Sequence, residues 1–225
     1  MMAAAADGPT RRMMLGGAFA CASQSTLAGP SAQSPSSPAG RLAFSVWREA
    51  QKIGRHSLLF RGDAQGFQVE IDAVMAVRLG PLTLFQYHHQ ATEIWRGGDF
   101  VALTSHTVTN GRREQLSANA SRAGVTVTTL SGVRELPADT LPLTHWNARA
   151  LAGRLFNPQT GAVMRESLTR RAGQVLRKSD GRLLPSTAFV LSGDAELTDW
   201  YDANGVWVAL RAKAPDGSVI DYRQV

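Results

Sequence analysis

Residues 67–79 read FQVEIDAVMAVRL, and this stretch decides the fold class. Every odd-numbered position is apolar, and most even-numbered positions before Val74 are polar. A period of two is typical of a β-strand with one buried face. At roughly 3.3 Å per residue the stretch would extend about 43 Å, so we expect a strongly twisted and coiled sheet.

The strand pattern continues along the chain on both sides of this stretch. A bend at residues 79–82 leads into a second long strand at residues 83–96. Further strands are predicted at residues 42–48, 55–61, 100–109, 113–122, 125–131, 197–202, 206–214 and 218–224. Gly-rich, Asn-Gly and Asp-Gly pairs mark hairpin turns between them, and a turn is expected near residues 52–54. The sequence therefore predicts a mainly β domain over residues 41–225, a strongly curved antiparallel meander that forms an open half-barrel.

One segment departs from the strand period. Residues 143–153 read LTHWNARALAG, with Thr144 as a possible N-cap and Gly153 as a possible C-terminal stop. We expect a short helix here, with Trp146 and Ala150 or Leu151 on one side, covering an edge of the sheet.

The first forty residues have the pattern of an export signal of the twin-arginine type followed by a linker. Arg11 and Arg12 precede a weakly apolar run at residues 13–22, and sequence rich in Pro, Ser and Gly follows. The run is too short to span a bilayer, so we expect a removable segment and a periplasmic or secreted mature chain. Cys21, the only cysteine, lies in this leader, and its lipidation is the alternative.

Charge and composition limit the classes of partner. The formal net charge is +6, and 24 Lys and Arg face 18 Asp and Glu. In an exported chain this surplus does not point to nucleic acid, and we expect a monomer with no cofactor and no transmembrane segment after cleavage. The basic residues near the C-terminal half predict a solvated hairpin face or, alternatively, contact with anionic envelope lipid: Arg165, Arg170, Arg171, Arg177, Lys178 and Arg182.

The sequence contains no established catalytic motif, and the catalytic residues stay unknown. The most suggestive polar cluster lies in the second long strand, where Tyr87, His89, Glu93 and Trp95 share one face. Adjacent His88 and His89 point to opposite faces, so we expect no metal site.

Glu93 stands among aromatic residues on that face. A buried carboxylate is costly without a partner, so we expect it to be buried and bonded to a group from another strand, such as an Arg, His89 or Tyr87. Glu93 is interpreted either as part of a buried polar cluster with a structural role or as a ligand-binding or acid–base carboxylate. Further candidates for the lining of a ligand site are Trp146, Asn147, Trp200 and Asp202.

A series of short motifs runs in order through the mature chain. These are Phe44-Ser45-Val46, Ile53-Gly54-Arg55-His56, Glu93-Ile94-Trp95 with Gly97, Thr107-Val108-Thr109-Asn110-Gly111, His145-Trp146-Asn147, Asn157-Pro158-Gln159-Thr160-Gly161 and Trp200-Tyr201-Asp202. On these motifs residues 41–225 resemble a family of secreted bacterial proteins known only as a domain of unknown function, number 6134. The resemblance implies a curved antiparallel sheet similar to periplasmic lipoprotein carriers and outer-membrane-associated half-barrels, and it carries no activity.

The leading functional hypothesis is an exported, non-enzymatic protein whose curved sheet binds an apolar, lipid or sugar ligand. The second is an enzyme acting on an envelope sugar, with Glu93 as acid or base, His89 or His56 as its partner, and Asn147 or Asp202 positioning the substrate. The third is a structural adaptor, which would present an uncovered edge strand and a large apolar patch.

Overall fold

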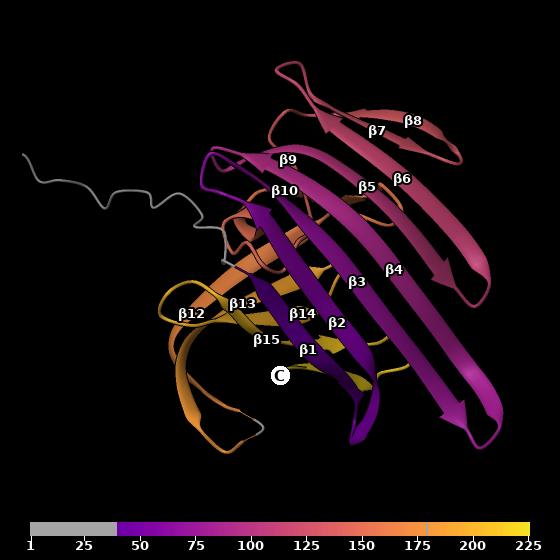
Figure 1. Ribbon diagram of the computed structural model, residues 1–225, viewed down its shortest axis with the longest axis vertical. Helices are drawn as coiled ribbons and strands as arrows, with labels where there is room; N and C mark the ends of the chain where they lie inside the picture. The colour runs from indigo at the N-terminus through magenta and orange to yellow at the C-terminus, as the bar shows by residue number, and fades with distance from the viewer. Residues whose placement is uncertain (1–39, 179) are drawn as a thin grey trace, which may run out of the picture. The chain divides into compact units, whose positions relative to one another are not determined.

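The computed structural model describes residues 40–178 and 180–225 (Figure 1). The predicted export signal, its cleavage region and Cys21 lie outside the described residues. Among the helical residues that are described, none belongs to a helix long and apolar enough to cross a membrane.

The described chain is built around one large sheet. Thirteen strands within residues 40–178 and 180–225 form this antiparallel sheet, which confirms the predicted fold class of a mainly β antiparallel meander. Its N-terminal strands are β1 (Arg41–Arg48), β2 (Gln51–Gly62), β3 (Gly66–Leu79), β4 (Leu82–Arg96), β5 (Asp99–Thr109), β6 (Arg112–Ala120), β7 (Val125–Thr129) and β8 (Gly132–Leu136). Its C-terminal strands are β12 (Glu166–Arg177), β13 (Leu183–Gly193), β14 (Leu197–Tyr201), β15 (Trp207–Lys213) and β16 (Val219–Gln224).

The two ends of the domain meet in the middle of the sheet. β1 pairs with β16, and Phe44 lies opposite Gln224, so the strand order runs from β12 through β16 and β1 to β8. Figure 1 shows this junction as indigo strands beside yellow ones. The meander is therefore continuous across the termini, and its edges are β12 and β8.

The edge strand β12 carries much of the basic stretch. Arg170, Arg171 and Arg177 are exposed along it, and β12 pairs with β13 as the predicted hairpin. Charged side chains on an edge strand oppose pairing with another chain. The basic residues thus protect the edge that an adaptor would need to leave open.

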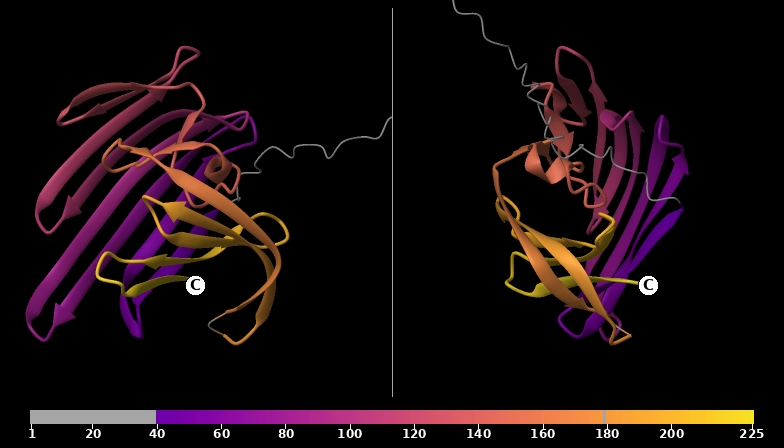
Figure 2. Two further views of the ribbon diagram at one scale, coloured as in Figure 1. Left: turned by 180° about the vertical axis from the view of Figure 1, so that it is seen from behind. Right: turned by 90° about the vertical axis from the view of Figure 1, so that its left-hand side faces the viewer.

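The segment between β8 and β12 forms a small separate sheet. It consists of β9 (Thr140–Pro142), β10 (Arg154–Phe156) and β11 (Val163–Met164), with β9 and β10 parallel. Figure 2 shows this segment against the concave side of the large sheet. Trp146, Leu151 and Phe156 from this segment join the same core as Trp95 of β4 and Tyr201 of β14. The concave face is therefore filled mainly by the chain's own side chains.

The predicted helix over residues 143–153 is shorter than expected. Only a 3-10 turn forms, η1 (Ala150–Ala152). Its backbone hydrogen bonds link residues three apart, as from Ala150 N to Asn147 O at 3.0 Å. Leu143 N donates instead to Phe156 O at 2.9 Å, which holds the start of the segment extended. Thr144 is buried and caps nothing in η1, whose N-cap is Arg149.

The first hairpin turn lies earlier than the sequence suggested. The turn falls at Glu49 and Ala50, where Glu49 adopts φ 51° and its carboxylate accepts from Val219 N at 2.7 Å. Gly54 lies instead inside β2, opposite Met75. A Cβ on Gly54 would stand 2.0 Å from the carbonyl oxygen of Val74, so this position needs glycine because β3 passes very close.

Gly54→Ala is therefore expected to destabilise the fold by about 2–3 kcal/mol, since β2 or β3 must shift to admit the methyl group. Gly66→Ala is the matched control, because its Cβ would meet no atom closer than 3.5 Å, and it should change stability by less than about 1 kcal/mol. Urea unfolding of both variants measures the difference. Equal stabilities of the two variants would contradict the close approach of β3.

Candidate functional site

A cavity of about 150 Å³ lies on the inner face of the large sheet. Its floor comes from β2, β3 and β4, and its other walls come from residues 143–145 and 157–159 and from Tyr222 of β16. The polar and aromatic side chains that line it are His56, Tyr87, His89, Glu93, Thr144, His145, Asn157, Gln159 and Tyr222.

Part of the floor is a row of residues that crosses four strands. His56 of β2 lies opposite Ala73 of β3, Ala73 opposite His89 of β4, and His89 opposite Thr107 of β5. Side chains in register on neighbouring strands share a face, so both imidazoles stand on the concave side. The small Ala73 between them leaves the space that the cavity occupies.

The two imidazoles of this row differ in their partners. His89 Nδ1 lies 2.8 Å from the hydroxyl of Thr107, whereas neither ring nitrogen of His56 has a hydrogen-bond partner among the described residues. His56 is only 8% exposed and packs edge-on against Trp207 and Tyr222. Burial lowers the pKa of His56 to about 3 and that of His89 to about 4, so both rings are neutral at pH 7.

A third imidazole at the cavity, that of the partly exposed His145, pairs with the buried carboxylate of Asp199. His145 Nδ1 lies 2.9 Å from one carboxylate oxygen of Asp199, and Trp207 Nε1 donates to the other at 2.8 Å. Tyr201 Oη donates to the backbone oxygen of His145 at 2.7 Å. Burial alone would lower the pKa of His145, but the carboxylates of Asp199 and Glu93 raise it above its ordinary value.

Glu93 is buried, as predicted, but its partners are different from those expected. Its Oε2 accepts from Trp95 Nε1 at 2.8 Å and from Trp146 Nε1 at 3.0 Å, and the carboxylate is 1% exposed. Trp95 is on the same strand and Trp146 is in the segment after β9. Within the described part of the chain, none of the expected partners, an Arg, His89 or Tyr87, bonds to Glu93. Desolvation raises the pKa of Glu93, while the hydrogen bonds from Trp146 and Trp95 oppose that rise.

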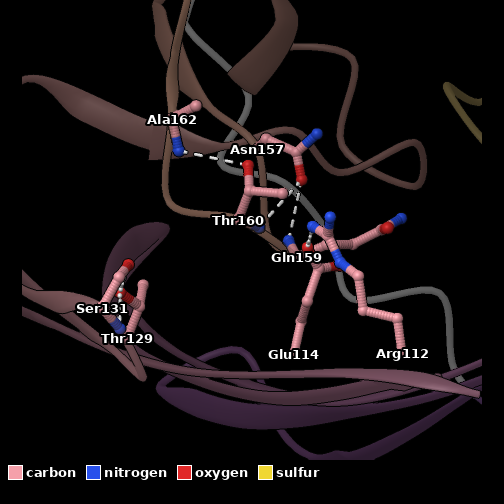
Figure 3. Close-up of polar contacts among 8 residues, drawn as sticks. All are labelled: Arg112, Glu114, Thr129, Ser131, Asn157, Gln159, Thr160 and Ala162. Atoms are coloured by element: carbon pink, nitrogen blue, oxygen red, sulfur yellow. Dashed lines mark hydrogen bonds and ion pairs between the residues drawn. The ribbon is translucent and has the colours of Figure 1, made fainter. Parts of the chain in front are cut away.

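The loop at residues 157–161 closes the cavity. Asn157 Oδ1 accepts from the backbone N–H groups of Gln159 and Thr160, which holds a tight turn (Figure 3). Gly161 ends the turn at φ 69°, where a Cβ would stand 2.7 Å from Val127. The turn aims Gln159 at the sheet, where Gln159 Nε2 donates to Tyr87 Oη at 2.6 Å.

The predicted site residues fall into separate places. Tyr87, His89 and Glu93 line the cavity. Trp95 and Trp146 do not line it, but their indole N–H groups donate hydrogen bonds to the Glu93 carboxylate. The other three predicted residues lie elsewhere. Asn147 accepts from Arg149 N beside η1, Trp200 is half-buried on the opposite face of the sheet, and Asp202 accepts from Asn204 N and Val206 N in the β14–β15 turn.

Several residues of the site were not predicted from the sequence, among them His145, Gln159 and Tyr222, which line the cavity, and Asp199, which pairs with His145. Gln159 stands in the Asn157-Pro158-Gln159-Thr160-Gly161 motif, which was visible in the sequence without any stated role. The role of Asp199 could not be predicted from the sequence, because it pairs with His145, a residue 54 positions away. No group of three or more His, Cys, Asp or Glu side chains within the described residues is placed to hold a metal ion.

The low pKa values of the histidine row predict an acid sensitivity. Unfolded histidine takes up a proton near its ordinary pKa of 6.5, whereas His56 and His89 do so only near 3 and 4. Between pH 7.5 and 5 the unfolded state therefore binds more protons, and each residue should cost about 2 kcal/mol of stability on acidification. His145, with its raised pKa, opposes part of this loss.

Replacing His56 by leucine isolates one of these contributions. His56→Leu should be more stable relative to wild type at pH 5 than at pH 7.5, by about 2 kcal/mol. The exposed His106→Gln serves as control and should keep the wild-type loss. Denaturant unfolding at the two pH values measures this, and an unchanged acid loss in His56→Leu would refute the burial of a neutral imidazole.

Comparison with solved structures supports the fold. A crystal structure of a β-barrel-like protein of domain of unknown function DUF1849 from Brucella abortus is similar, with a TM-score of 0.61 over 82% of this chain and 94% of that one. The two sequences are 11% identical, so the likeness concerns the fold alone. A search of curated proteins found no match. The family model described as domain of unknown function DUF6134 matches residues 44–225, and the chain therefore belongs to the DUF6134 family.

Proposed function

We propose that this protein is an exported binding protein that holds a small polar or amphipathic molecule in the inner cavity. The observation that carries the proposal is His56, a buried imidazole at the cavity whose two ring nitrogens lack partners among residues 40–178 and 180–225. A neutral imidazole offers one donor and one acceptor. A buried polar group of this kind is costly unless something bonds to it.

The size of the cavity argues for a small ligand. Its volume of about 150 Å³ is below the roughly 300–1,000 Å³ of sites for larger organic molecules. The remainder of the concave face is occupied by core side chains such as Trp146 and Phe156. This favours a small polar molecule over the long lipid chain that the curved sheet alone would suggest.

The chemistry of the lining indicates hydroxyl groups on the ligand. His56 and His89 are neutral rings, and Tyr87 and Gln159 add a phenol and an amide beside them. Such groups both donate and accept hydrogen bonds, as ligand hydroxyls do. The rings of Tyr87 and Tyr222 suit the apolar face of a sugar or polyol. Arg11 and Arg12 ahead of an apolar run support the periplasm as the place where this ligand is met.

Native mass spectrometry of protein purified from its own envelope tests the proposal. We expect a bound small molecule that is released on denaturation. Ala73→Leu should fill the space between His56 and His89 and abolish retention of the molecule, whereas Ala172→Leu on exposed β12 should retain it. Absence of any bound molecule from wild type, or equal retention by Ala73→Leu, would refute the proposal.

A second candidate function is general acid–base catalysis, and one observation favours it. His145 lines the cavity while Asp199 fixes its Nδ1, and a carboxylate that orients an imidazole is a recurring catalytic arrangement. Under this alternative, wild type and His145→Gln would release molecules of different mass, the product and the substrate. Identical released masses would leave only the binding function.

A further inference from the structure

A second hollow, of about 340 Å³, lies on the outward face of the sheet over β14, β15 and β16. Its side chains alternate with core residues: Trp200 lies between buried Asp199 and Tyr201, Arg211 follows buried Leu210, and Arg223 follows Tyr222. They therefore point away from the inner cavity. We call this the outer hollow.

The end of β12 forms the remaining wall of the outer hollow. Leu176, Arg177 and Lys178 line it, and Lys178 Nζ donates to Gln224 Oε1 at 3.3 Å. The hairpin of β12 and β13 is thus tied to β16, a strand several places away in the sheet. This tie makes the feature a walled hollow rather than a flat charged surface.

The charge of the outer hollow is strongly unbalanced. Arg177, Lys178, Arg211 and Arg223 line it, and Asp221 is the one carboxylate in that lining among the described residues. These side chains leave a surplus of three positive charges. The hollow therefore favours an anion of more than one negative charge.

The geometry of the two arginines on β15 and β16 organises this charge. Arg211 Nε lies 2.8 Å and Arg223 Nη2 lies 3.7 Å from different oxygens of Asp221, so one carboxylate positions both guanidinium groups. Arg223 also stacks 4.5 Å over the ring of Trp47, which limits its freedom. Each guanidinium has five N–H donors, and several remain after these contacts.

We propose that the outer hollow binds a phosphate group carried on an apolar or sugar moiety. Held guanidinium groups match the oxygens of phosphate, and the surplus charge suits a phosphate better than a single carboxylate. Trp200, Leu176 and Ala209 provide an apolar floor for the rest of the molecule. This site is separate from the inner cavity and does not rest on its proposed function.

The phosphate has two possible sources, which two probes distinguish. Flotation with vesicles of equal parts phosphatidylcholine and phosphatidic acid tests a lipid headgroup that is a phosphomonoester, and calorimetry with glycerol 3-phosphate tests the same group free in solution. Binding to the vesicles alone identifies a lipid, and binding to both probes identifies the phosphate group itself as sufficient. Failure of both probes to bind would overturn the proposal.

Paired variants separate a built site from general positive charge. Arg211→Gln with Arg223→Gln should weaken binding at least tenfold, and Arg177→Gln alone, which removes an exposed side chain, should weaken it about threefold. The charge-matched control is Arg96→Gln with Arg113→Gln, on exposed positions outside the hollow, and it should bind within twofold of wild type. Equal loss in both double variants would show non-specific attraction and refute the site. Retention of a molecule in the inner cavity should stay unchanged in all of them.

Discussion

Glu93→Ala is expected to lower the free energy of unfolding by about 3–5 kcal/mol. The substitution leaves the indole N–H groups of Trp95 and Trp146 without an acceptor in the core, and each unsatisfied buried donor costs about 1–3 kcal/mol. It also leaves a void in the core where the Glu93 side chain stood, because Glu93 is only 1% exposed.

Glu93→Gln separates the hydrogen bonds from the charge. The amide oxygen still accepts from both indoles, so the expected loss is below about 1.5 kcal/mol. Glu135→Ala, on the exposed face of β8, is the control and should cost less than about 0.5 kcal/mol. Urea unfolding of the three variants decides the matter. Similar small losses for Glu93→Ala and Glu93→Gln would mean that the two indoles do not depend on this acceptor.

Asp199→Ala is expected to cost a similar amount, about 3–5 kcal/mol. Asp199 is fully buried, and its removal leaves the buried indole N–H of Trp207 without an acceptor and the partly exposed His145 without its partner. The exposed pair of His88 with Asp72, at 2.8 Å, is the matched control. Asp72→Ala should cost less than about 1 kcal/mol because solvent replaces the lost partner.

The pH dependence of Asp199→Asn tests the same pair from another side. The raised pKa of His145 means that its contribution to stability is fully present below the unfolded pKa of 6.5 and is lost as pH rises through the folded pKa. The deficit of Asp199→Asn relative to wild type should therefore be largest near pH 6 and shrink towards pH 9. A deficit independent of pH would contradict an ion pair at this position.

Local patterns predicted ten of the thirteen strands of the large sheet, because apolar residues alternate on the buried face of each, whereas no strand bounds were predicted for β8, β12 and β13. The alternation at residues 67–79 and 83–96 gave β3 and β4 almost to the residue. The pairing of β1 with β16 could not be predicted from the sequence, since alternation does not show which distant strands pair with one another. The helix over residues 143–153 was predicted too long for a related reason: Trp146 is fixed by a bond to Glu93 that local propensity does not contain.

The candidate site was predictable only where it lies on one strand. Tyr87, His89 and Glu93 share a face of β4, and the period of two placed them together. His56 and His145 reach the same cavity from β2 and from the segment after β9, through contacts that only the fold creates. Trp200 failed as a member of this site because its strand turns that side chain outward, into the outer hollow.

We propose the space between His56, His89 and Gln159 as the ligand site of this protein. A crystal structure of protein purified from its own envelope, without an unfolding step, tests it most directly. We expect density for a small non-protein molecule in this cavity, with a polar atom within hydrogen-bond distance of a ring nitrogen of His56. A cavity closed by side chains, or one that holds water alone, would contradict the claim.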